Sequence, residues 1–547
     1  MKIVAAVFAD FAQAPAGGPS RLLTPLAGRP VLRHTLERLL RVEGVAERCL
    51  FVRPRDEEPA AKFLQEANLN ARIELLPKDD APRPRRLLLT TARKWNLESW
   101  RGGLLGTTWF DEFVDPHATA LLINHYKCQA VFCVDGHQPV FDPEISSAMI
   151  THLREHEQEC KIVFTQAPAG LTGILVTRAC LEDLLEFNIP LGMALSYRPE
   201  LPQPDPITFY PCYQLPPEVV QTPARLVADT RRSCELIEGA LTELGAAASA
   251  ATVVNWLRQP DRHRAGTLPV EAELELTTAD PLPDTTLRPR GTRIPARQLD
   301  NVDALTRLAR ELAAYDDRLV VLGGAGDPLQ HPRFAEVCGI LRDAGVYGLC
   351  VTTPLVDLTD DQLAALFLHR VDVLEVSLDA HTPATYQRVH RRDVYGRVIT
   401  NIERIEQVRR QQQAPQPIIV PSITRCAATI GEIERFYDDW IRKTGFAVIR
   451  GYNDYGGLLP RDSLLSTTPL VRSPCRRLNS RLTLLADGKA SACSQDVAAK
   501  MSVGDWFTEQ LAEVWAGSRL AALREAHMSL SLEAFPICSR CGEWNRP

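Results

Sequence analysis

The sequence is short of long apolar runs. No uninterrupted apolar stretch approaches the roughly 18 residues that a helix needs to cross a bilayer, so we expect no membrane span. Basic residues interleaved with aromatic ones are also missing and the formal net charge is -6, so we expect no nucleic acid as a partner. The apolar start, residues 1–14, is interrupted by Asp10 too early for a secretory signal, and a strand over residues 2–8 is the better interpretation. We therefore expect a cytoplasmic protein.

Neither disorder nor a fibrous architecture agrees with the composition. The hydrophobic fraction of 45% and the charged fraction of 24% are near the averages of soluble globular proteins. With 547 residues the chain is too long for one hydrophobic core. Typical domain sizes predict roughly three or four folded units.

A disulfide framework is equally unexpected, although the chain has 14 cysteines. Such frameworks belong to small secreted domains. In a long chain without a secretory signal, scattered cysteines are better interpreted as small buried apolar residues. The cysteines in this class are Cys49, Cys128, Cys133, Cys160, Cys180, Cys212, Cys234, Cys338, Cys350 and Cys426. Those that remain lie near the end of the chain and need another explanation.

The first part of the chain alternates apolar strands with helices, which predicts an α/β sheet. A proline-rich stretch, residues 197–223, then breaks the periodicity as a surface connector would. A helical piece over residues 226–257 follows, and the polar run 258–266 after it is the predicted main domain boundary. The predicted strands are 2–8, 130–134 and 160–164, and the predicted helices are 30–40 and 144–156.

The following part repeats one pattern of strands and helices. Leu305, Leu308 and Leu312 fall on one helical face, and Gly345 is placed to end the next helix. Such alternation implies right-handed βαβ units in a parallel sheet or partial barrel. In these barrels the chemistry lies at the C-terminal ends of the strands. The predicted strands are 272–277, 319–322, 348–352, 373–377, 418–423 and 446–450.

Four cysteines near the end of the chain form the clearest candidate site: Cys475, Cys493, Cys538 and Cys541. Two residues separate the last pair, so one turn can present both thiolates to a metal, and the two distant cysteines complete a four-sulfur shell. Buried apolar cysteines would not explain why the terminal pair lies in a short polar segment. Spacing alone does not choose between zinc and an iron-sulfur cluster.

The residues around these cysteines resemble the SPASM domain that follows radical-SAM cores. The cysteine pattern is joined to a Gly-Asp turn and to a helix that carries Trp515. The resemblance implies an auxiliary [4Fe-4S] cluster bound by the four cysteines. The matching segments are Leu485-Ala486-Asp487-Gly488, Ala492-Cys493-Ser494-Gln495-Asp496, Val503-Gly504-Asp505, Val514-Trp515, Leu523-Arg524 and Cys538-Ser539-Arg540-Cys541.

The preceding strands and helices resemble a radical-SAM barrel. The segment from Leu322 to Leu329 is similar to the glycine-rich loop whose backbone approaches S-adenosylmethionine, where glycine permits close contact. Asp327 stands where glutamate is usual. The segment Val376-Ser377-Leu378-Asp379-Ala380 is similar to the fourth-strand segment beside the same ligand. The resemblance implies that S-adenosylmethionine would contact Gly323, Gly324, Gly326, Asp327, Ser377 and Asp379.

The family's C-x3-C-x2-C loop, whose thiolates hold the cluster that chelates S-adenosylmethionine, is replaced in this chain. Alignment on the Thr277-Thr278 pair puts Asp280, Asp284 and Leu287 at the three cysteine positions. Leucine cannot ligate iron, and hard carboxylates are poor substitutes for soft thiolates. The usual Asn-Gly of the third strand is replaced by Thr353-Pro354 as well. We expect no cluster at this position and no reductive cleavage of S-adenosylmethionine.

The start of the chain resembles sugar nucleotidyltransferases of the cytidylyltransferase type. The segments from Gly17 to Leu22 and from Pro25 to Leu36 carry the likeness, which implies a glycine-rich loop around nucleotide phosphates. The usual lysine has no room between Arg21 and Pro25, and His137 stands where a metal-binding aspartate is expected. Asp135 can reach a metal or act as a turn residue. The segments Trp109-Phe110-Asp111-Glu112 and Asp229-Thr230-Arg231-Arg232 have no physical explanation at this level.

The parts together resemble the spiro-SPASM protein family. The predicted fold class is α/β, and four parts follow one another: a nucleotidyltransferase-like domain of GT-A or Rossmann-like type over 1–225, a helical connector over 226–265, a partial (β/α)6 radical-SAM-like barrel over 266–455 and a small SPASM iron-sulfur domain over 470–547. The resemblance implies one auxiliary cluster and a barrel that is non-catalytic or altered in activity. A nucleotide, a nucleotide-sugar or a partner protein is the expected ligand. An active radical-SAM enzyme with an atypical cluster site and a sugar nucleotidyltransferase are the alternatives.

Overall fold

The computed structural model describes residues 1–70, 72–77, 83–200, 205–259, 266–289, 294–460, 462–464 and 468–545. Over these residues the chain forms two compact units, Met1–His263 and Arg264–Pro547. Each unit is built on its own main sheet, with six strands in the first and nine in the second.

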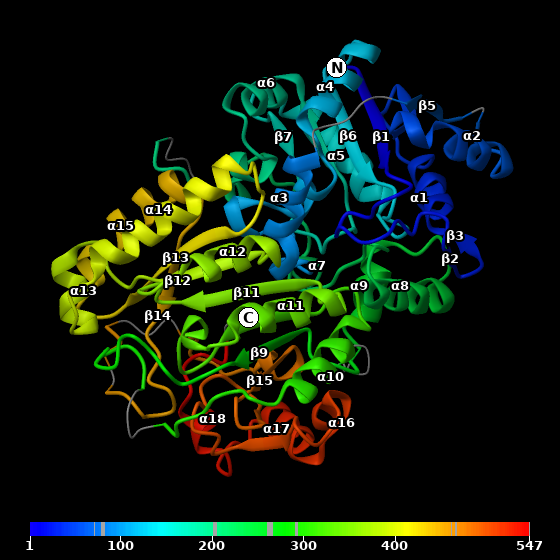
Figure 1. The fold of residues 1–547 in the computed structure, drawn as a ribbon. Helices are drawn as coiled ribbons and strands as arrows, with labels where there is room; N and C mark the ends of the chain where they lie inside the picture. Colours follow the sequence, from blue (N-terminus) through cyan, green and yellow to red (C-terminus); the bar gives the residue numbers. More distant parts are fainter. Residues whose placement is uncertain are drawn as a thin grey trace. The chain divides into compact units, whose positions relative to one another are not determined.

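A mixed sheet in the order β5-β4-β1-β6-β8-β7 forms the first unit (Figure 1). β1 pairs in parallel with both β4 and β6, whereas β8 runs antiparallel to β6 and β7. The short strands β2 and β3 pair only with each other. The strands are β1 (Ile3–Ala9), β2 (Pro25–Leu26), β3 (Arg29–Pro30), β4 (Glu47–Val52), β5 (Glu74–Pro77), β6 (Ala130–Asp135), β7 (Ile162–Val163) and β8 (Ile174–Thr177).

Helices cover both faces of this sheet, as expected for β1, in which every residue is apolar and buried. On one face Ala5 and Val7 share a core with α1 and α5. On the other face Ala6 and Phe8 share a core with α4 and α6. The helices are α1 (Val31–Leu39), α2 (Glu57–Glu66), α3 (Arg83–Arg93), α4 (Pro116–Tyr126), α5 (Pro143–Glu155), α6 (Arg178–Phe187), α7 (Pro217–Val220), α8 (Arg231–Leu244) and α9 (Ala250–Leu257).

The helical stretch predicted over residues 226–257 is two helices rather than one. Gly245 ends α8 with a φ of 82°, which a glycine adopts without strain. The side chains of Thr230 and Ser249 accept backbone N–H groups at the starts of α8 and α9. The two helices belong to one hydrophobic cluster, which also contains Val31 and other residues of the first unit.

A sheet in the order β14-β13-β12-β11-β10-β9-β15-β16-β17 forms the second unit. From β9 to β14, strands that follow one another along the chain are parallel neighbours, and each pair is joined by a helical crossover (Figure 1). The predicted α/β fold class, with its partial (β/α)6 barrel, is confirmed. The strands are β9 (Glu271–Glu275), β10 (Leu319–Gly323), β11 (Gly348–Thr353), β12 (Val373–Ser377), β13 (Ile418–Arg425), β14 (Val448–Gly451), β15 (Arg481–Leu484), β16 (Lys489–Ser491) and β17 (Ser502–Asp505).

The predicted strand positions agree closely with these bounds. β12 coincides with the predicted 373–377, whereas β9 ends at Glu275, two residues before the predicted end. After Glu275 the chain no longer pairs with β10. Thr277 instead forms an isolated antiparallel bridge to Gln298. Gly345 ends α11 with a φ of 97°, as predicted. The helices are α10 (Val302–Ala313), α11 (Phe334–Ala344), α12 (Asp360–Leu368), α13 (Pro383–His390), α14 (Tyr395–Gln411), α15 (Ile433–Thr444), α16 (Leu511–Ala516), α17 (Ser518–Met528) and α18 (Pro536–Arg540).

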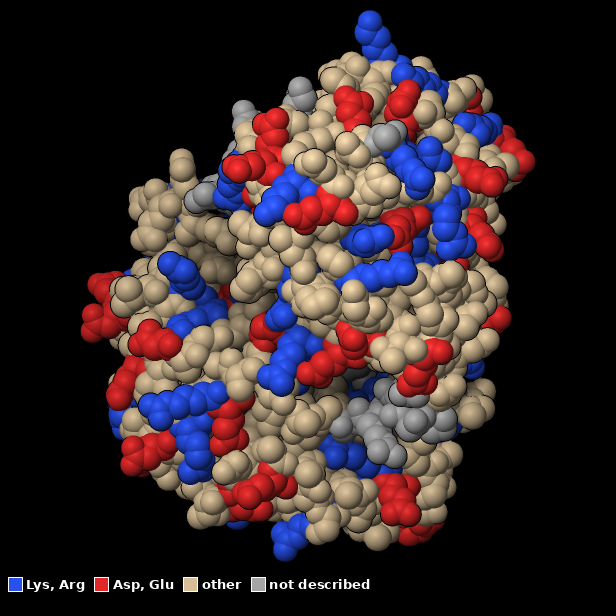
Figure 2. Space-filling model, turned by 90° about the vertical axis from the view of Figure 1, so that its right-hand side faces the viewer, with Lys and Arg blue, Asp and Glu red and all other residues tan. Residues whose placement is uncertain are grey.

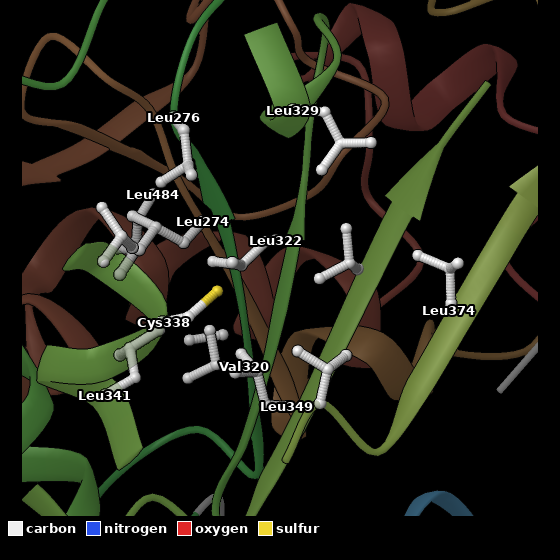
Figure 3. Close-up of a cluster of buried hydrophobic side chains, with 14 of the residues drawn as sticks. Leu274, Leu276, Val320, Leu322, Leu329, Cys338, Leu341, Leu349, Leu374 and Leu484 are labelled. Carbon is white, nitrogen blue, oxygen red and sulfur yellow. The ribbon is translucent and has the colours of Figure 1, made fainter. Parts of the chain in front are cut away.

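The cysteine-rich end of the chain extends the sheet of the barrel. β15 pairs in parallel with β9, and β16 and β17 then continue the sheet in antiparallel fashion. Leu484 of β15 lies beside Leu274 of β9, in the same buried cluster as Leu322 and Leu341 (Figure 3). The two segments therefore share one hydrophobic core, although more than 200 residues separate Leu274 from Leu484 along the chain.

On the face drawn in Figure 2, lysine and arginine side chains lie interspersed with aspartate and glutamate. Of the helices that the structure describes, none has both the length and the apolar character that a membrane span requires.

Candidate functional site

The fold brings the four C-terminal cysteines together. Cys475 precedes a short 3-10 turn, Cys493 follows β16, Cys538 lies in α18 and Cys541 ends that helix. Burial, with smaller contributions from the thiols of Cys493, Cys541 and Cys475, raises the pKa of Cys538 to about 12. Burial likewise raises the pKa of Cys493 to about 12, with contributions from Cys475 and Cys541. The four thiols are thus electrostatic neighbours of one another.

Hydrogen bonds that involve both backbone and side-chain groups hold the four cysteines in place. The Cys475 N–H donates to Nδ1 of His527 over 3.3 Å, which ties the first cysteine to α17. Arg472 donates from Nη2 to the Cys538 carbonyl over 2.7 Å. Two sulfurs also accept N–H groups, Cys493 from Gln495 at 3.5 Å and Cys541 from Glu543 at 3.2 Å.

These features fit an iron-sulfur cluster. Thiols that raise one another's pKa need positive charge between them to become thiolates, and bound iron supplies it. N–H groups directed at cysteine sulfur are one means by which proteins tune such clusters. Within the described parts of the chain, no three His, Cys, Asp or Glu side chains are arranged around a single metal ion. The four thiols are therefore neighbours without forming a one-ion shell.

The ten scattered cysteines are all buried, as predicted, and none of them forms a disulfide. Burial raises the pKa of several, among them Cys180 and Cys338, each to about 12. A thiol with so high a pKa remains protonated and behaves as a small apolar group.

The glycine-rich loop follows β10 and packs against the residues after β9. Gly324 has a φ of 94°. A Cβ on Gly326 would lie 2.3 Å from the Thr277 carbonyl oxygen and 2.6 Å from that of Ala279. Only glycine allows this approach of two backbones. Sequence predicted the glycines, and the neighbouring loop explains why Gly326 is needed.

Asp327 ends this loop as a completely buried acid. Its Oδ1 accepts the Leu329 N–H over 3.1 Å, whereas Oδ2 has no hydrogen-bond partner among the described residues. Burial and the charge of Asp280 raise its pKa to about 7, against the opposing effects of the Thr353 hydroxyl and the Leu329 N–H. Asp327 is therefore partly protonated near neutral pH and can donate or accept a hydrogen bond.

Ser377 and Asp379 lie at the end of β12, on the same edge of the sheet as the glycine-rich loop. Both are buried. Asp379 has a φ of 54° and accepts the Thr424 N–H over 2.9 Å. Nη2 of Arg288 lies 3.8 Å from Asp379 Oδ2. Because carboxyl ends of parallel strands meet at one edge, the fold gathers all six predicted S-adenosylmethionine contacts there.

The loop that would carry the three radical-SAM cysteines is folded by its own contacts. Asp280 accepts the Leu282 N–H over 2.7 Å, and Asp284 is exposed. Leu287 is buried against Val389. These side chains do not fit a three-thiolate cluster shell.

Contacts to α13 fix the same loop. His390 donates from Nε2 to the Leu378 carbonyl over 3.3 Å, so its Nδ1 accepts the Thr285 hydroxyl at 2.9 Å. The Thr286 N–H donates to the Val389 carbonyl over 3.0 Å. Hydrogen bonds to α13 therefore fix the conformation of this loop.

Sequence reasoning missed a row of acids on β9. Glu271, Glu273 and Glu275 alternate with Ala272 and Leu274, and Leu274 lies in the core shared with the helices. The glutamates therefore point to the opposite, inner face of the sheet. The alternation itself was the signal that could have revealed them.

Arginines neutralise most of this inner face. Arg481 lies 3.2 Å from Glu271, Arg297 pairs with Glu275, and Arg450 pairs with Glu375 of β12. Burial raises the pKa of Glu273, whose Oε2 accepts a hydrogen bond from the Thr483 hydroxyl over 3.4 Å. A sheet face that carries ion pairs in place of an apolar core suits a polar ligand.

In the first unit His137 connects the glycine-rich loop to the end of β6. Its Nε2 accepts the Arg21 N–H over 3.3 Å, so Nδ1 carries the proton that it shares with Asp135 Oδ1 at 2.9 Å. The His137 N–H donates to the same oxygen over 2.8 Å. Asp135 is thus engaged by the histidine that stands at the expected aspartate position.

A cavity of about 90 Å³ opens at the carboxyl ends of β1, β4 and β6. Phe8 and Phe51 line it, with ring centroids 5.4 Å apart. Asp10 contacts Arg53 at 3.1 Å and Arg86 at 2.5 Å. Burial alone would raise the pKa of Asp10, but these arginines and two backbone N–H groups hold it below the ordinary value.

A buried ion network explains the two segments that sequence left without an account. Glu112 binds Arg93 at 2.9 Å and Arg225 at 2.7 Å, and Arg225 also pairs with Asp229. Asp229 in turn accepts the Ala16 N–H over 3.1 Å. The network therefore anchors the glycine-rich loop, and Glu112 also lines the cavity at the strand ends.

Comparison with known proteins identifies two domain families in the second unit. The radical SAM superfamily matches residues 285–411, and SPASM, an iron-sulfur cluster-binding domain, matches residues 475–542. The first match begins after Asp280 and Asp284, and the second starts at Cys475 and includes Cys493, Cys538 and Cys541.

The individual proteins that match this chain have low sequence identity to it. An uncharacterized protein of Treponema pallidum (strain Nichols) is 27% identical over 299 residues, which is 52% of this chain and 80% of that protein. Streptococcus suis SuiB bound to S-adenosylmethionine is 12% identical, over 53% of this chain and 78% of its own, with a TM-score of 0.41. A cytidylyltransferase from Leptospira borgpetersenii is 12% identical, over 47% of this chain and 94% of its own, with a TM-score of 0.32.

The two domain matches confirm the resemblance drawn from the sequence. Both domain families imply iron-sulfur clusters as cofactors. The second unit therefore contains a radical SAM superfamily domain and a SPASM domain.

Proposed function

We propose that the second unit binds one [4Fe-4S] cluster through Cys475, Cys493, Cys538 and Cys541. The observation that carries the proposal is the mutual proximity of these four thiols, each of which is buried or half-buried. When bound, the cluster would supply one-electron chemistry. Arg472, His527 and the N–H groups of Gln495 and Glu543 would fix the cysteines around it.

We further propose that the barrel lacks the cluster with which radical-SAM enzymes cleave S-adenosylmethionine, so the barrel is non-catalytic or altered in activity. The loop at that position offers Asp280, Asp284 and Leu287, two hard ligands and one that cannot bind iron. Backbone contacts at Gly324 and Gly326, together with Asp327, would still allow weak binding of S-adenosylmethionine. Ser377 and Asp379 would lie beside such a ligand.

Iron and sulfide counts on anaerobically purified protein test these proposals. Four irons and four sulfides per chain are expected. Eight would indicate a second cluster and favour an active radical-SAM enzyme with an atypical cluster site. Zinc without sulfide would contradict the cluster itself.

A nucleotide or nucleotide-sugar ligand of the first unit is the second candidate function. The cavity at the strand ends favours it, because Phe8 and Phe51 offer apolar rings and Arg53 and Arg86 offer positive charge at the same place. Titration calorimetry with CTP and with a CMP-sugar tests it. Binding lost in Arg86→Ala would support the ligand, and no heat with either compound would contradict it.

A reducing compartment such as the cytoplasm suits this chain. None of the 14 cysteines forms a disulfide in the described part of the chain. Free thiols in this number persist where glutathione and thioredoxin keep them reduced.

A further inference from the structure

The inner face of the sheet in the second unit remains open to solvent. On the other face the mid-strand leucines Leu274, Leu322 and Leu374 are buried in the core (Figure 3). Side chains between them on the inner face are only half-buried or exposed, although most belong to central strands. A face with such side chains is not filled by packing, so it lines a hollow. We call it the inner hollow, lined by Glu273 of β9, Val321 of β10, Thr352 of β11, Glu375 of β12 and Arg450 of β14.

The charges of the inner hollow are unequal by one. Three of the four glutamates on this face have an arginine each, in the pairs Glu271–Arg481, Glu275–Arg297 and Glu375–Arg450. Glu273, in the middle of β9, forms no ion pair with any lysine or arginine that the structure describes. Burial raises the pKa of Glu273 and the charge of Glu271 adds to this, whereas Arg481 and Arg450 act in the opposite direction. One acid in the inner hollow therefore lacks a direct counter-charge.

There is room for a ligand beside this carboxylate. Oε2 of Glu273 accepts the Thr483 hydroxyl over 3.4 Å. On the other side, a Cβ added to Gly323 would lie 3.5 Å from Oε1 of Glu273, so the missing side chain of Gly323 leaves that oxygen accessible.

Other polar atoms of the same face also lack partners. Oε1 of Glu375 and Nη1 of Arg297 have no hydrogen-bond partner within the described parts of the chain. The Arg297 side chain is only 2% exposed. Because buried polar groups are rarely left without a partner, these atoms indicate that the inner hollow holds a polar ligand.

We infer that the inner hollow binds a primary amine, whose ammonium group pairs with Glu273. An ammonium group carries the missing positive charge and three N–H donors, one of which can reach Oε1 of Glu273. The inference goes beyond the contacts proposed for S-adenosylmethionine, because Glu273 lies within β9 and not in the loops at the strand ends. It also does not depend on the cluster of the four C-terminal cysteines.

Two other cations fit the inner hollow less well. Among the residues that the structure describes, no three His, Cys, Asp or Glu side chains surround a single metal ion, so a divalent metal would find too few ligands. A guanidinium group binds best to a carboxylate with both oxygens free, and Oε2 of Glu273 is already engaged by Thr483.

The test is titration calorimetry on the full chain. Putrescine is the probe for a free amine, and Nα-acetyl-lysine methylamide is the probe for a lysine side chain. Magnesium chloride, Nα-acetyl-arginine methylamide and S-adenosylmethionine are the alternative ligands. Glu273→Gln removes the charge, and Gly323→Val fills the space beside Oε1 without a change of charge. Glu336→Gln is the matched control, because Glu336 lies on α11 in an exposed pair with Arg333.

At least one of the two amines should bind to the wild type, and the tighter one identifies the source of the ammonium group. Glu273→Gln and Gly323→Val should each weaken that binding about tenfold, as expected for the loss of a hydrogen bond to a charged group. Glu336→Gln should bind as the wild type does.

Urea unfolding separates a binding role of Glu273 from a structural one. Glu273→Gln should unfold at the same or a higher urea concentration than the wild type, because it removes a charge that has no counter-charge. A lower midpoint would show that Glu273 stabilises the fold and would overturn the inference.

The calorimetry can overturn it as well. No heat with either amine, or equal affinity in the wild type and Glu273→Gln, would do so. Binding of magnesium or of the arginine derivative in place of the amines would assign the inner hollow to another cation. A loss of S-adenosylmethionine binding in Glu273→Gln, without amine binding to the wild type, would assign Glu273 to that ligand instead. A chain without iron would contradict the proposed cluster, whereas the amine titration would still decide this inference.

Discussion

Glu275 and Arg297 form a buried two-point ion pair, with Nε 2.6 Å from Oε1 and Nη2 2.9 Å from Oε2. The same carboxylate accepts the N–H of Ala325 at 3.2 Å and that of Ala486 at 3.4 Å. Arg297 also donates to the Val497 carbonyl over 2.9 Å. One ion pair thus joins the glycine-rich loop of the barrel to the segment that carries Cys493.

Glu275→Gln should lower the free energy of unfolding of the second unit by about 3 kcal/mol, because it leaves a buried guanidinium without its counter-charge. Denaturant titration followed by tryptophan fluorescence measures the change. Glu336→Gln is the control, since Glu336 forms an exposed pair with Arg333 and should leave the transition where it is. Equal midpoints for the two variants would contradict a structural role for Glu275.

Removal of the terminal pair of cysteines should abolish cluster binding. Cys538→Ala with Cys541→Ala leaves two thiolates, too few to hold four irons. Iron and sulfide per chain and visible absorption are the measurements, and Cys350→Ala, which alters a buried scattered cysteine, is the control. Broad visible absorption that survives in the double variant would count against these ligands.

Asp327 should make the stability of the second unit fall as pH rises from about 4 to about 7. Its pKa is higher in the folded chain than in the unfolded chain, so between these values the folded state holds a proton that the unfolded state has lost. Stability present at low pH is therefore lost on the way to pH 7. Urea titrations at several pH values test this, and Asp327→Asn should flatten the dependence. A wild-type profile equal to that of Asp327→Asn would show that the acid is not buried in its protonated form.

Local pattern predicted the strands well for a physical reason. β12 and its neighbours are short apolar runs bounded by turn residues, and burial on both faces needs such runs. The glycines after β10 and the cysteine pair at the end of the chain were likewise visible, because their chemistry depends on residue type and close spacing.

Long-range relationships were not visible. Nothing in residues 481–484 indicates that β15 pairs with β9, since the two segments are far apart in sequence and either could pair elsewhere. The Glu275–Arg297 pair and the Glu112–Arg225–Asp229 network depend on the same kind of contact. Glu112 and Asp229 belong to segments that the sequence left unexplained, and only the fold shows that both pair with Arg225.

No 5′-deoxyadenosine should form when dithionite-reduced protein is incubated with S-adenosylmethionine. Reductive cleavage needs a cluster that chelates the methionine, and the loop offers Asp280, Asp284 and Leu287 instead. A cluster bound by all four C-terminal cysteines would leave no iron open. Chromatography of the quenched mixture gives the answer. Several turnovers of product, lost in Asp327→Ala, would establish the barrel as an active enzyme.

The first unit should not join a nucleoside triphosphate to a sugar. Transfer of a phosphoryl group needs a cation and a metal to stabilise the developing charge. The loop from Gly17 to Leu22 has no lysine, and Asp135 is already bound twice by His137, which is 1% exposed. We therefore expect no magnesium-dependent release of pyrophosphate from CTP with a sugar acid, measured by a coupled phosphate assay. His137→Asp, which restores the expected acid, should not rescue the reaction because the lysine is still missing. Release above background by the wild-type chain would make the first unit an active nucleotidyltransferase and would require another cation to replace the lysine.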